Sequence, residues 1–394
     1  MYEKKILSEF SIIISMILIL FVSCSSTKGS MGEKKDAEKE KIMTEVENTD
    51  DMKYAFPFED EKHEGTWLQW PHDYTYGKGF KGELDPIWIE MTRGLTSGEN
   101  VHIIVYNNKE KNRVKNLLTQ KGIDMNKIIF YIHPTDDVWV RDNGPIFVYD
   151  KDDNLLMADW GFNGWGQKTP YKKCLEIPKK LSKGLNTPRI DIHEVVLEGG
   201  SVEFDGNGTC MSTRSAVINK NRNPNLTEKE IESYIKRYYG ASNFIWLDGV
   251  VGQDITDFHI DGFVKFYNSS TIITMNEEDL SIEWGVSKKD INTLREAKNI
   301  DGAPYEYIYL PLSKNNVILE SGKKLGYKGS YINFYIGNDV VLVPNYNDEN
   351  DKKANAILQE LYPNRKIIGI DVRKLYQYGG MIHCVTQQQP INKK

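Results

Sequence analysis

Cysteine is scarce in this 394-residue sequence, and its scarcity excludes a disulfide or zinc framework as the main support of the fold. The four cysteines are Cys24, Cys174, Cys210 and Cys384, without a Cys-x-x-Cys pair or a Cys/His group at zinc spacing. Cys24 ends a short apolar run, and the other three leave at least one free thiol in any compartment. We therefore expect no metal site, and we interpret Cys174 and Cys210 as buried packing thiols.

The sequence also lacks a surplus of basic charge. Its formal net charge is −6, and its lysines and arginines are dispersed rather than clustered. Nucleic acid is therefore not an expected partner. An acidic balance agrees with a cationic ligand.

The N-terminal apolar stretch, residues 10–22, is too short to span a bilayer but suits a signal-peptide core. Lys4 and Lys5 precede it, and the segment that ends at Cys24 resembles a bacterial lipobox. Residues 1–23 are thus predicted to be a lipoprotein signal peptide, and Cys24 the lipidated first residue of an exported, membrane-anchored protein of the cell envelope. The alternative is an uncleaved short membrane anchor.

Residues 24–53 are rich in Lys, Glu, Ser, Thr and Gly and have few large apolar side chains, so they are predicted to be a flexible tether. Residues 54–394 contain no comparable linker and are predicted to be one large catalytic domain. Strand-like and helix-like runs alternate there, which indicates an α/β or α+β class. Expected strands are residues 101–106, 127–132, 144–149, 271–275 and 340–344, and expected helices are residues 109–121, 227–239, 288–298 and 352–362.

The most informative segment is GGMIHCVTQQQP, residues 379–390, which places Cys384 shortly after a Gly pair. Small residues before a reactive thiol let the backbone and a substrate approach the sulfur, so we predict that Cys384 is a nucleophile. His383 is its neighbour, and because successive side chains of a strand point to opposite faces, we expect a structural role for His383.

Two upstream segments supply the other groups that a cysteine hydrolase needs. DVWVRDNGP, residues 137–145, places Asp142 at the expected end of a strand, and DFHIDGFVKF, residues 257–266, contains His259 and Asp261. In an extended segment His259 and Asp261 share one face. Two carboxylates, an imidazole and a thiol suit a planar guanidinium, which carboxylates bind through paired hydrogen bonds. Each residue alone also fits a purely structural role, as a turn former or a structural histidine.

Several ordered motifs identify a family. These are WLQWP at 67–71, DVWVRDNGP, DWGFNGWG at 159–166, LEGGS at 197–201, NRNP at 221–224 and the His259 and Cys384 segments. The chain resembles the agmatine deiminase and bacterial (Porphyromonas-type) peptidylarginine deiminase family over about residues 67–390. The resemblance implies the pentein fold, a single-domain, five-bladed, pseudo-symmetric α/β propeller of ββαβ units.

The resemblance also implies roles for individual residues. Cys384 is the expected nucleophile, His259 the acid and base, Asp142 and Asp261 the guanidinium-binding carboxylates, and Glu198 the carboxylate that orients His259. Trp139 and Trp165 are expected in the substrate pocket, although Trp139 and Trp160 also fit the core. No metal or organic cofactor takes part.

Agmatine is the favoured substrate, because the WGFNGWG stretch resembles the agmatine-specific branch. Its surroundings, residues 159–173, contain lysines but no arginine that would hold a peptide carboxylate. The segment 257–262 departs from the family's usual Asn-Gly-His-Val-Asp-Asn, so conversion of peptidyl-arginine to citrulline is the alternative. A non-catalytic, surface-binding lipoprotein with the same fold is the second alternative. Both a monomer and a homo-oligomer are compatible with the sequence.

Overall fold

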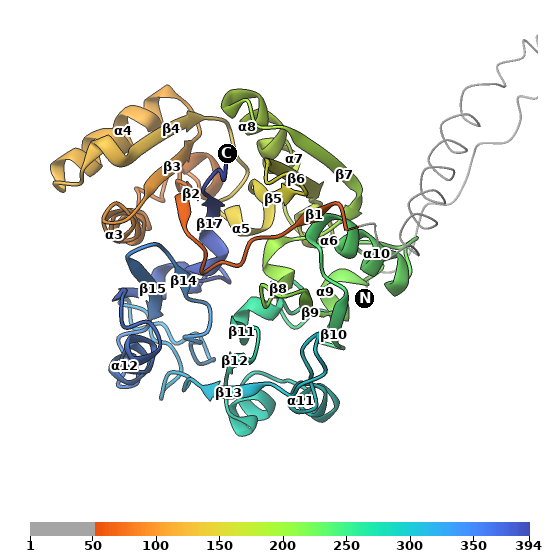
Figure 1. Cartoon of the computed structure of the whole chain (residues 1–394). Helices are drawn as coiled ribbons and strands as arrows, with labels where there is room; N and C mark the ends of the chain where they lie inside the picture. Colours follow the sequence, from red (N-terminus) through yellow and green to blue (C-terminus); the bar gives the residue numbers. More distant parts are fainter. Residues whose placement is uncertain (1–51) are drawn as a thin grey trace, which may run out of the picture. The chain divides into compact units, whose positions relative to one another are not determined.

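The computed structural model describes residues 52–394 of the chain (Figure 1). The predicted signal peptide, Cys24 and nearly all of the predicted tether lie outside the described residues. Within the described residues, no helix combines the length and the apolar character that a membrane crossing requires.

Five small sheets make up the strand content of residues 52–394. Four follow one pattern, in which two antiparallel strands precede a third strand that runs parallel to the second. They consist of β5 (Ile146–Asp150), β6 (Leu155–Gly161) and β7 (Arg189–Val196), with β1 (Tyr54–Ala55) at the edge; β8 (Val202–Phe204), β9 (Thr209–Thr213) and β10 (Asn243–Leu247); β11 (Val264–Asn268), β12 (Thr271–Thr274) and β13 (Glu306–Tyr309); and β14 (Tyr335–Ile336), β15 (Val340–Asn345) and β16 (Lys366–Asp371).

The fifth sheet joins the two ends of the described chain. Its strands are, in order, β17 (Gln387–Pro390), β2 (His63–Gln69), β3 (Asn100–Val105) and β4 (Ile128–Ile132). β17 pairs antiparallel with β2, with Gln387 opposite Trp67, whereas β2, β3 and β4 are parallel. Because Cys384 lies just before β17, this pairing fixes the segment that carries it.

The parallel strands of each sheet are joined through helices, which lie on the outside in Figure 1. The longer ones are α3 (Asp85–Leu95), α4 (Asn108–Gln120), α8 (Ile177–Leu185), α10 (Glu228–Tyr239), α11 (Lys288–Arg295) and α12 (Asp351–Leu361). Each buries an apolar face against its sheet, as Val114 and Leu118 of α4 illustrate. The four predicted helices are confirmed within three residues at each end, and Thr227 and Glu230 form the predicted capping box at the start of α10.

The five predicted strands are likewise found, as β3, β4, β5, β12 and β15. The mixed α/β class is therefore confirmed. The remaining short elements are α2 (Asp73–Tyr76), η1 (Met125–Lys127), α5 (Val140–Asn143), α6 (Gly164–Gln167), α7 (Lys172–Leu175), η2 (Gly199–Ser201), α9 (Arg214–Val217), η3 (Ile260–Gly262), η4 (Asp279–Glu283), α13 (Arg373–Tyr376) and η5 (His383–Val385).

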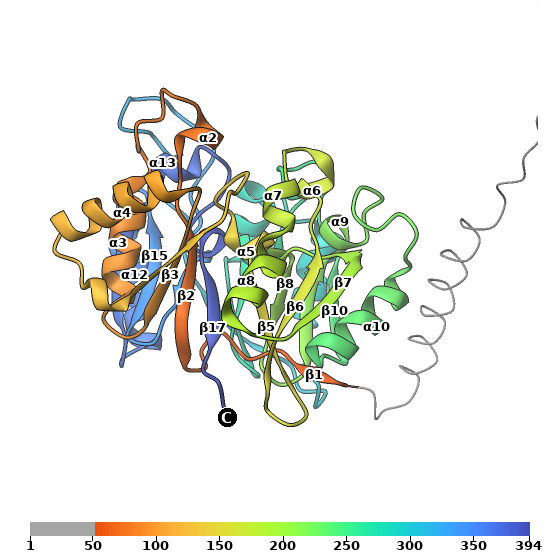
Figure 2. The ribbon, with the colours of Figure 1, turned by 90° about the horizontal axis from the view of Figure 1, so that it is seen from above.

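Four of these short elements carry the predicted site. Helix α5 contacts both η2 and η5, and η2 contacts η3. Each ends one to three residues before a strand of a different sheet: β5, β8, β11 and β17. Segments that are far apart in the sequence therefore meet between the sheets (Figure 2).

Candidate active site

Cys384 lies in η5, partly exposed, whereas the other two described cysteines are free and buried, as predicted. Its Sγ is 3.4 Å from Asn333 Oδ1 and 3.9 Å from Asp261 Oδ2. Burial raises the pKa of the Cys384 thiol well above its ordinary value, and the charges of Asp261 and Asp142 raise it further. The sulfur therefore carries a proton until a cation neutralises these carboxylates.

The Gly pair before Cys384 fits closely against the pocket wall. A Cβ atom at Gly380 would lie 2.3 Å from the ring of Trp139, which leaves no room for a side chain. Gly379 has a φ of 97°, a conformation that favours glycine. The close approach predicted for this pair is thus made to an aromatic ring.

His259 does not lie in an extended segment, contrary to the reasoning from sequence. It precedes η3, and Asp261 lies inside that 3-10 helix, yet both side chains reach the same place. His259 Nδ1 is 3.7 Å from Asp142 Oδ1, and Nε2 is 3.6 Å from Glu198 Oε2. Burial opposes charge on the imidazole, but Asp142, Glu198 and Asp261 outweigh it and raise the His259 pKa to about 9.

Asp142 lies in the short helix α5 rather than at the end of a strand, because residues 140–143 form a helical turn before β5. Its carboxylate accepts hydrogen bonds from Trp165 Nε1 at 2.9 Å and Gly200 N at 3.0 Å. Burial raises the Asp142 pKa, opposed by His259 and supported by Asp261 and Glu198. His259 is the cation beside this carboxylate, and among the ion pairs of residues 52–394 no lysine or arginine pairs with Asp142, which suits a site for a cationic ligand.

Gly200 marks the point where these groups converge. A Cβ atom there would lie 2.8 Å from His259 Nδ1, 2.9 Å from Asp142 Oδ1 and 3.0 Å from Asp261 Oδ2. Any larger residue would displace three site groups together. This explains the second glycine of the LEGGS motif.

Asp261 is held by His383, whose Nδ1 is 2.8 Å from Asp261 Oδ2. The other ring nitrogen of His383 is 2.8 Å from Glu59 Oε2. Burial favours the neutral acid, but the hydrogen bond and charge of His383 keep the Asp261 pKa low. His383 lies in a 3-10 helix and not in the expected strand; it faces a different cavity from Cys384 and fixes the charge of Asp261.

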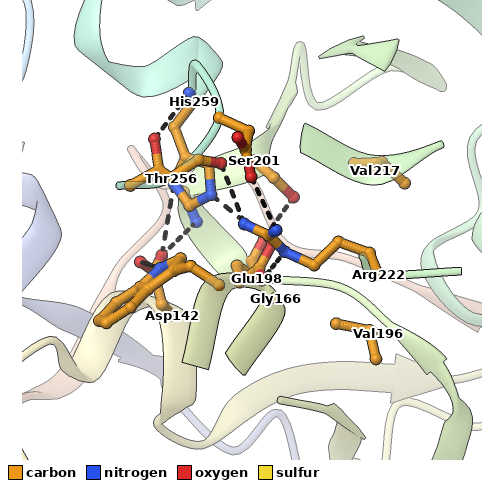
Figure 3. Close-up of polar contacts among 12 residues, drawn as sticks. Asp142, Gly166, Val196, Glu198, Ser201, Val217, Arg222, Thr256 and His259 are labelled. Atoms are coloured by element: carbon orange, nitrogen blue, oxygen red, sulfur yellow. Dashed lines mark hydrogen bonds and ion pairs between the residues drawn. The ribbon is translucent and has the colours of Figure 1, made fainter. Parts of the chain in front are cut away.

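Glu198 is fully buried and paired with Arg222, whose Nε donates to Oε1 at 2.6 Å (Figure 3). Burial would raise the Glu198 pKa, but Arg222 and then His259 lower it. The carboxylate therefore stays charged beside the imidazole. Arg222 belongs to the NRNP motif, but no local pattern predicts its pairing with Glu198.

One pocket contains four of the predicted residues: Cys384, Asp142, Trp139 and Trp165. Its other lining residues are Tyr76, Asp137, Ile255, Thr256, Tyr378, Gly379 and Gly380. Trp160 instead lies away from this pocket and packs on Tyr238 and Tyr239. Within residues 52–394, no group of three or more His, Cys, Asp or Glu side chains is arranged to hold a metal ion.

Comparison with known proteins shows the family of the chain. The sequence model of the Porphyromonas-type peptidyl-arginine deiminase family matches residues 55–390. The chain belongs to this family. It is a hydrolase that acts on guanidine C–N bonds.

Relatives in this family include an agmatine deiminase of Pseudomonas aeruginosa, 28% identical over 369 residues, with 86% of this chain and 96% of the relative covered. Agmatine deiminase of Enterococcus faecalis has a solved structure with a TM-score of 0.76 and 25% identity, covering 86% of this chain and 96% of that one. Campylobacter jejuni agmatine deiminase, solved with substrate bound, has a TM-score of 0.73 and 26% identity, covering 87% and 98%.

Replacing Asp142 with asparagine is expected to weaken guanidinium binding by about 2–4 kcal/mol, because it removes one of the buried charges that face the cation. This corresponds to a fall in kcat/KM of about 30- to 1000-fold, measured with a guanidine substrate at neutral pH. Trp165→Phe is the comparison variant, since it removes one hydrogen bond to Asp142 and part of the pocket wall but no charge, and should cost less. Equal effects of the two substitutions would contradict the charge argument.

Proposed function

We propose that this protein is an agmatine deiminase that converts agmatine and water into N-carbamoylputrescine and ammonia. The observation that carries the proposal is the convergence of Asp142, Asp261 and His259 on one point beside Gly200, with the Cys384 sulfur 3.9 Å from Asp261. This arrangement holds a planar cation by its nitrogens and leaves its central carbon to the sulfur.

The first half of the reaction follows from these positions. The guanidinium neutralises Asp142 and Asp261, which removes two of the causes that keep Cys384 protonated, so the thiol releases its proton to solvent. The thiolate attacks the guanidinium carbon and forms a C–S bond. One C–N bond then breaks, and protonated His259 donates its proton to the leaving nitrogen, which departs as ammonia.

The second half reverses the role of His259. The enzyme now carries a positively charged amidino-thioether on Cys384, and His259 is neutral. His259 takes a proton from water while the water oxygen attacks the same carbon. The C–S bond breaks and the second proton of the water passes to solvent, which leaves a neutral ureido product, a thiolate and a protonated imidazole. Once the product has left, the thiolate takes a proton from solvent and the resting state is restored.

Asp137 supports agmatine as the substrate. It is a half-buried carboxylate that lines the pocket and accepts hydrogen bonds from Tyr76 Oη at 2.8 Å and Val138 N at 2.9 Å. Burial raises the Asp137 pKa. Among the ion pairs found in residues 52–394, none involves Asp137. Agmatine has a guanidinium and an ammonium, so two anionic points in one pocket match both of its ends.

Two of the three lysines in residues 159–173 are engaged elsewhere, which also favours an amine-terminated substrate. Lys168 Nζ lies 2.7 Å from Asp257, and Lys173 Nζ lies 3.8 Å from Asp136. Using either lysine to hold a peptide carboxylate would require breaking an existing pair. Peptidyl-arginine deimination is therefore the second candidate, and it becomes the function if arginyl peptides give the higher kcat/KM.

The direct test compares agmatine with pentylguanidine, in which a methyl group replaces the terminal ammonium. The wild-type protein should favour agmatine in kcat/KM, and Asp137→Asn should reduce that preference by about 10- to 100-fold, because a buried charged hydrogen bond is lost. Arginyl peptides and free arginine complete the assay. A preference that Asp137→Asn leaves unchanged would remove Asp137 from ammonium recognition.

We also infer that the five sheets form a pentein-type propeller around the site. The repeated strand pattern supports this, as does the distribution of the sheets around the site-bearing elements in Figure 1. In such an arrangement each site element enters from a different blade, which explains why residues so distant in sequence share one pocket.

We further propose that the mature protein is a lipoprotein of the cell envelope, anchored through Cys24. The order of Lys4, Lys5, the apolar stretch 10–22 and Ser23-Cys24 supports this. Cys24→Ser should move the protein from the membrane fraction to the soluble fraction without changing the specific activity. Mass spectrometry that finds an unacylated Cys24 still joined to Ser23 would contradict the anchor.

A further inference from the structure

The turn immediately before His259 has an unusual backbone. Asp257 has a φ of 62° and Phe258 a φ of 81°, so two consecutive residues with side chains occupy the left-handed region. Residues other than glycine, asparagine and aspartate rarely adopt this conformation, because it costs them conformational free energy. The surrounding structure must therefore hold this turn in place.

The Asp257 carboxylate holds the turn in this conformation through its hydrogen bonds. Its side chain is buried, and Oδ2 accepts hydrogen bonds from Lys168 Nζ at 2.7 Å, Arg222 Nη1 at 2.9 Å and Asn221 Nδ2 at 3.0 Å. Oδ1 accepts from Gly252 N at 2.8 Å. Burial would raise the Asp257 pKa, but Lys168, Asn221, Gly252 and Arg222 together lower it, so the group stays charged.

Arg222 links this turn to the partner of His259. Its guanidinium is fully buried and donates to Asp257, to Glu198 Oε1 at 2.6 Å and to the Thr256 carbonyl at 3.0 Å (Figure 3). Thr256 Oγ1 in turn accepts from His259 N at 3.1 Å. One arginine thus connects the carboxylate that faces the imidazole with the backbone that carries the imidazole.

We propose that Asp257 is a positioning residue, which acts through Arg222 and the strained turn to set the distance between His259 and Glu198. This proposal rests on the proposed deiminase reaction, in which His259 moves the protons. Asp257 does not line the substrate pocket, so its effect is on the proton transfer and not on substrate binding.

The contact between His259 and Glu198 depends on the position of the turn that Asp257 holds. His259 Nε2 and Glu198 Oε2 are 3.6 Å apart, and both atoms are buried without a hydrogen-bond partner. The charged groups that face His259 are Asp142 from α5, Glu198 from the residue before η2 and Asp261 from η3. Displacement of the turn changes all three distances, but Glu198 is the one that Arg222 ties directly to Asp257.

The test replaces Asp257 with asparagine in the full-length protein. Asparagine tolerates a positive φ and is the family's usual residue here, where a glycine follows it. In this chain Phe258 follows with a φ of 81°, so the change removes the charge that holds a strained turn and keeps the backbone preference of residue 257. We expect kcat for agmatine to fall by about 100-fold with little change in KM, because a misplaced acid slows the chemistry and not the binding. Lys168→Met is the matched control, since it removes the half-buried lysine that binds Asp257 and the Ile255 carbonyl but leaves Asp257 paired with Arg222, and it should have a much smaller effect.

A second readout does not depend on the substrate. The His259 ring, assigned by comparison with His259→Asn, is titrated by NMR in the absence of substrate, and its pKa should fall in Asp257→Asn from about 9 toward 6.5. If wild-type protein does not use agmatine but this shift occurs, the proposed substrate is wrong and the positioning role stands. If kcat and the His259 pKa are both unchanged, or only the melting temperature falls, the positioning role is wrong.

Discussion

Replacing Cys384 with alanine is expected to lower turnover of a guanidine substrate by at least about 10⁴-fold, because removal of a nucleophile eliminates the covalent route. Cys384 is the only described cysteine in the pocket, and its side chain is partly exposed, so alanine should leave the fold and its thermal unfolding nearly unchanged. Ammonia release and ureido product are measured together, so that both products of the reaction are followed in each variant.

The matched controls are Cys174→Ala and Cys210→Ala. Both thiols are buried outside the pocket, and burial raises the Cys174 pKa to about 12, which makes it a poor nucleophile. These variants should lose some stability through a small cavity and keep their turnover. Full activity in Cys384→Ala would exclude a covalent mechanism, as would a guanidine substrate that does not protect Cys384 from a thiol reagent.

The local structure was largely predictable from the sequence. The helix 228–239 shows why: its Thr227–Glu230 capping box and its apolar period are local signals that tertiary packing reinforces. The β15 strand was similarly visible as a continuous apolar run, because both of its faces are buried. The conformation of the site segments was not predictable in this way.

The three segments around Asp142, His259 and Cys384 were read as strands or strand ends, but each forms a short helix. The apolar residues that alternate in these segments are buried between the sheets, and they do not belong to a strand. A side chain at position 261 therefore reaches the pocket by a helical turn and not by the two-residue repeat of a strand. The structure brings the side chains of Asp142, His259 and Asp261 together, although the geometry that the sequence predicts for their segments is wrong.

The partners of the site residues could not be predicted from the sequence. Arg222 pairs with Glu198 and Asp257, and His383 bridges Asp261 and Glu59. These contacts join residues that lie between 24 and 324 positions apart. No local period or spacing encodes such pairs, since they depend on how the sheets are placed around the site.

The second large effect is expected from His259→Asn, which should lower kcat by about 10²- to 10⁴-fold through loss of the general acid and base. Substrate binding should change much less, since Asp142 and Asp261 remain. Asparagine is close in size to the imidazole and leaves no additional charge in the pocket. The measurement is kcat and KM for agmatine across the pH range, in wild type and variant.

The raised pKa of His259 also predicts how turnover depends on pH. His259 must be protonated to release ammonia, and its neighbours raise its pKa from 6.5 to about 9, so wild-type turnover should fall as the pH rises through about 9. The raised pKa also stabilises the fold: this contribution to the free energy of unfolding is complete below pH 6.5 and is lost as the pH rises through about 9. Both effects should disappear in His259→Asn. An alkaline decrease in turnover that persists in the variant would assign that titration to another group and remove His259 as the acid.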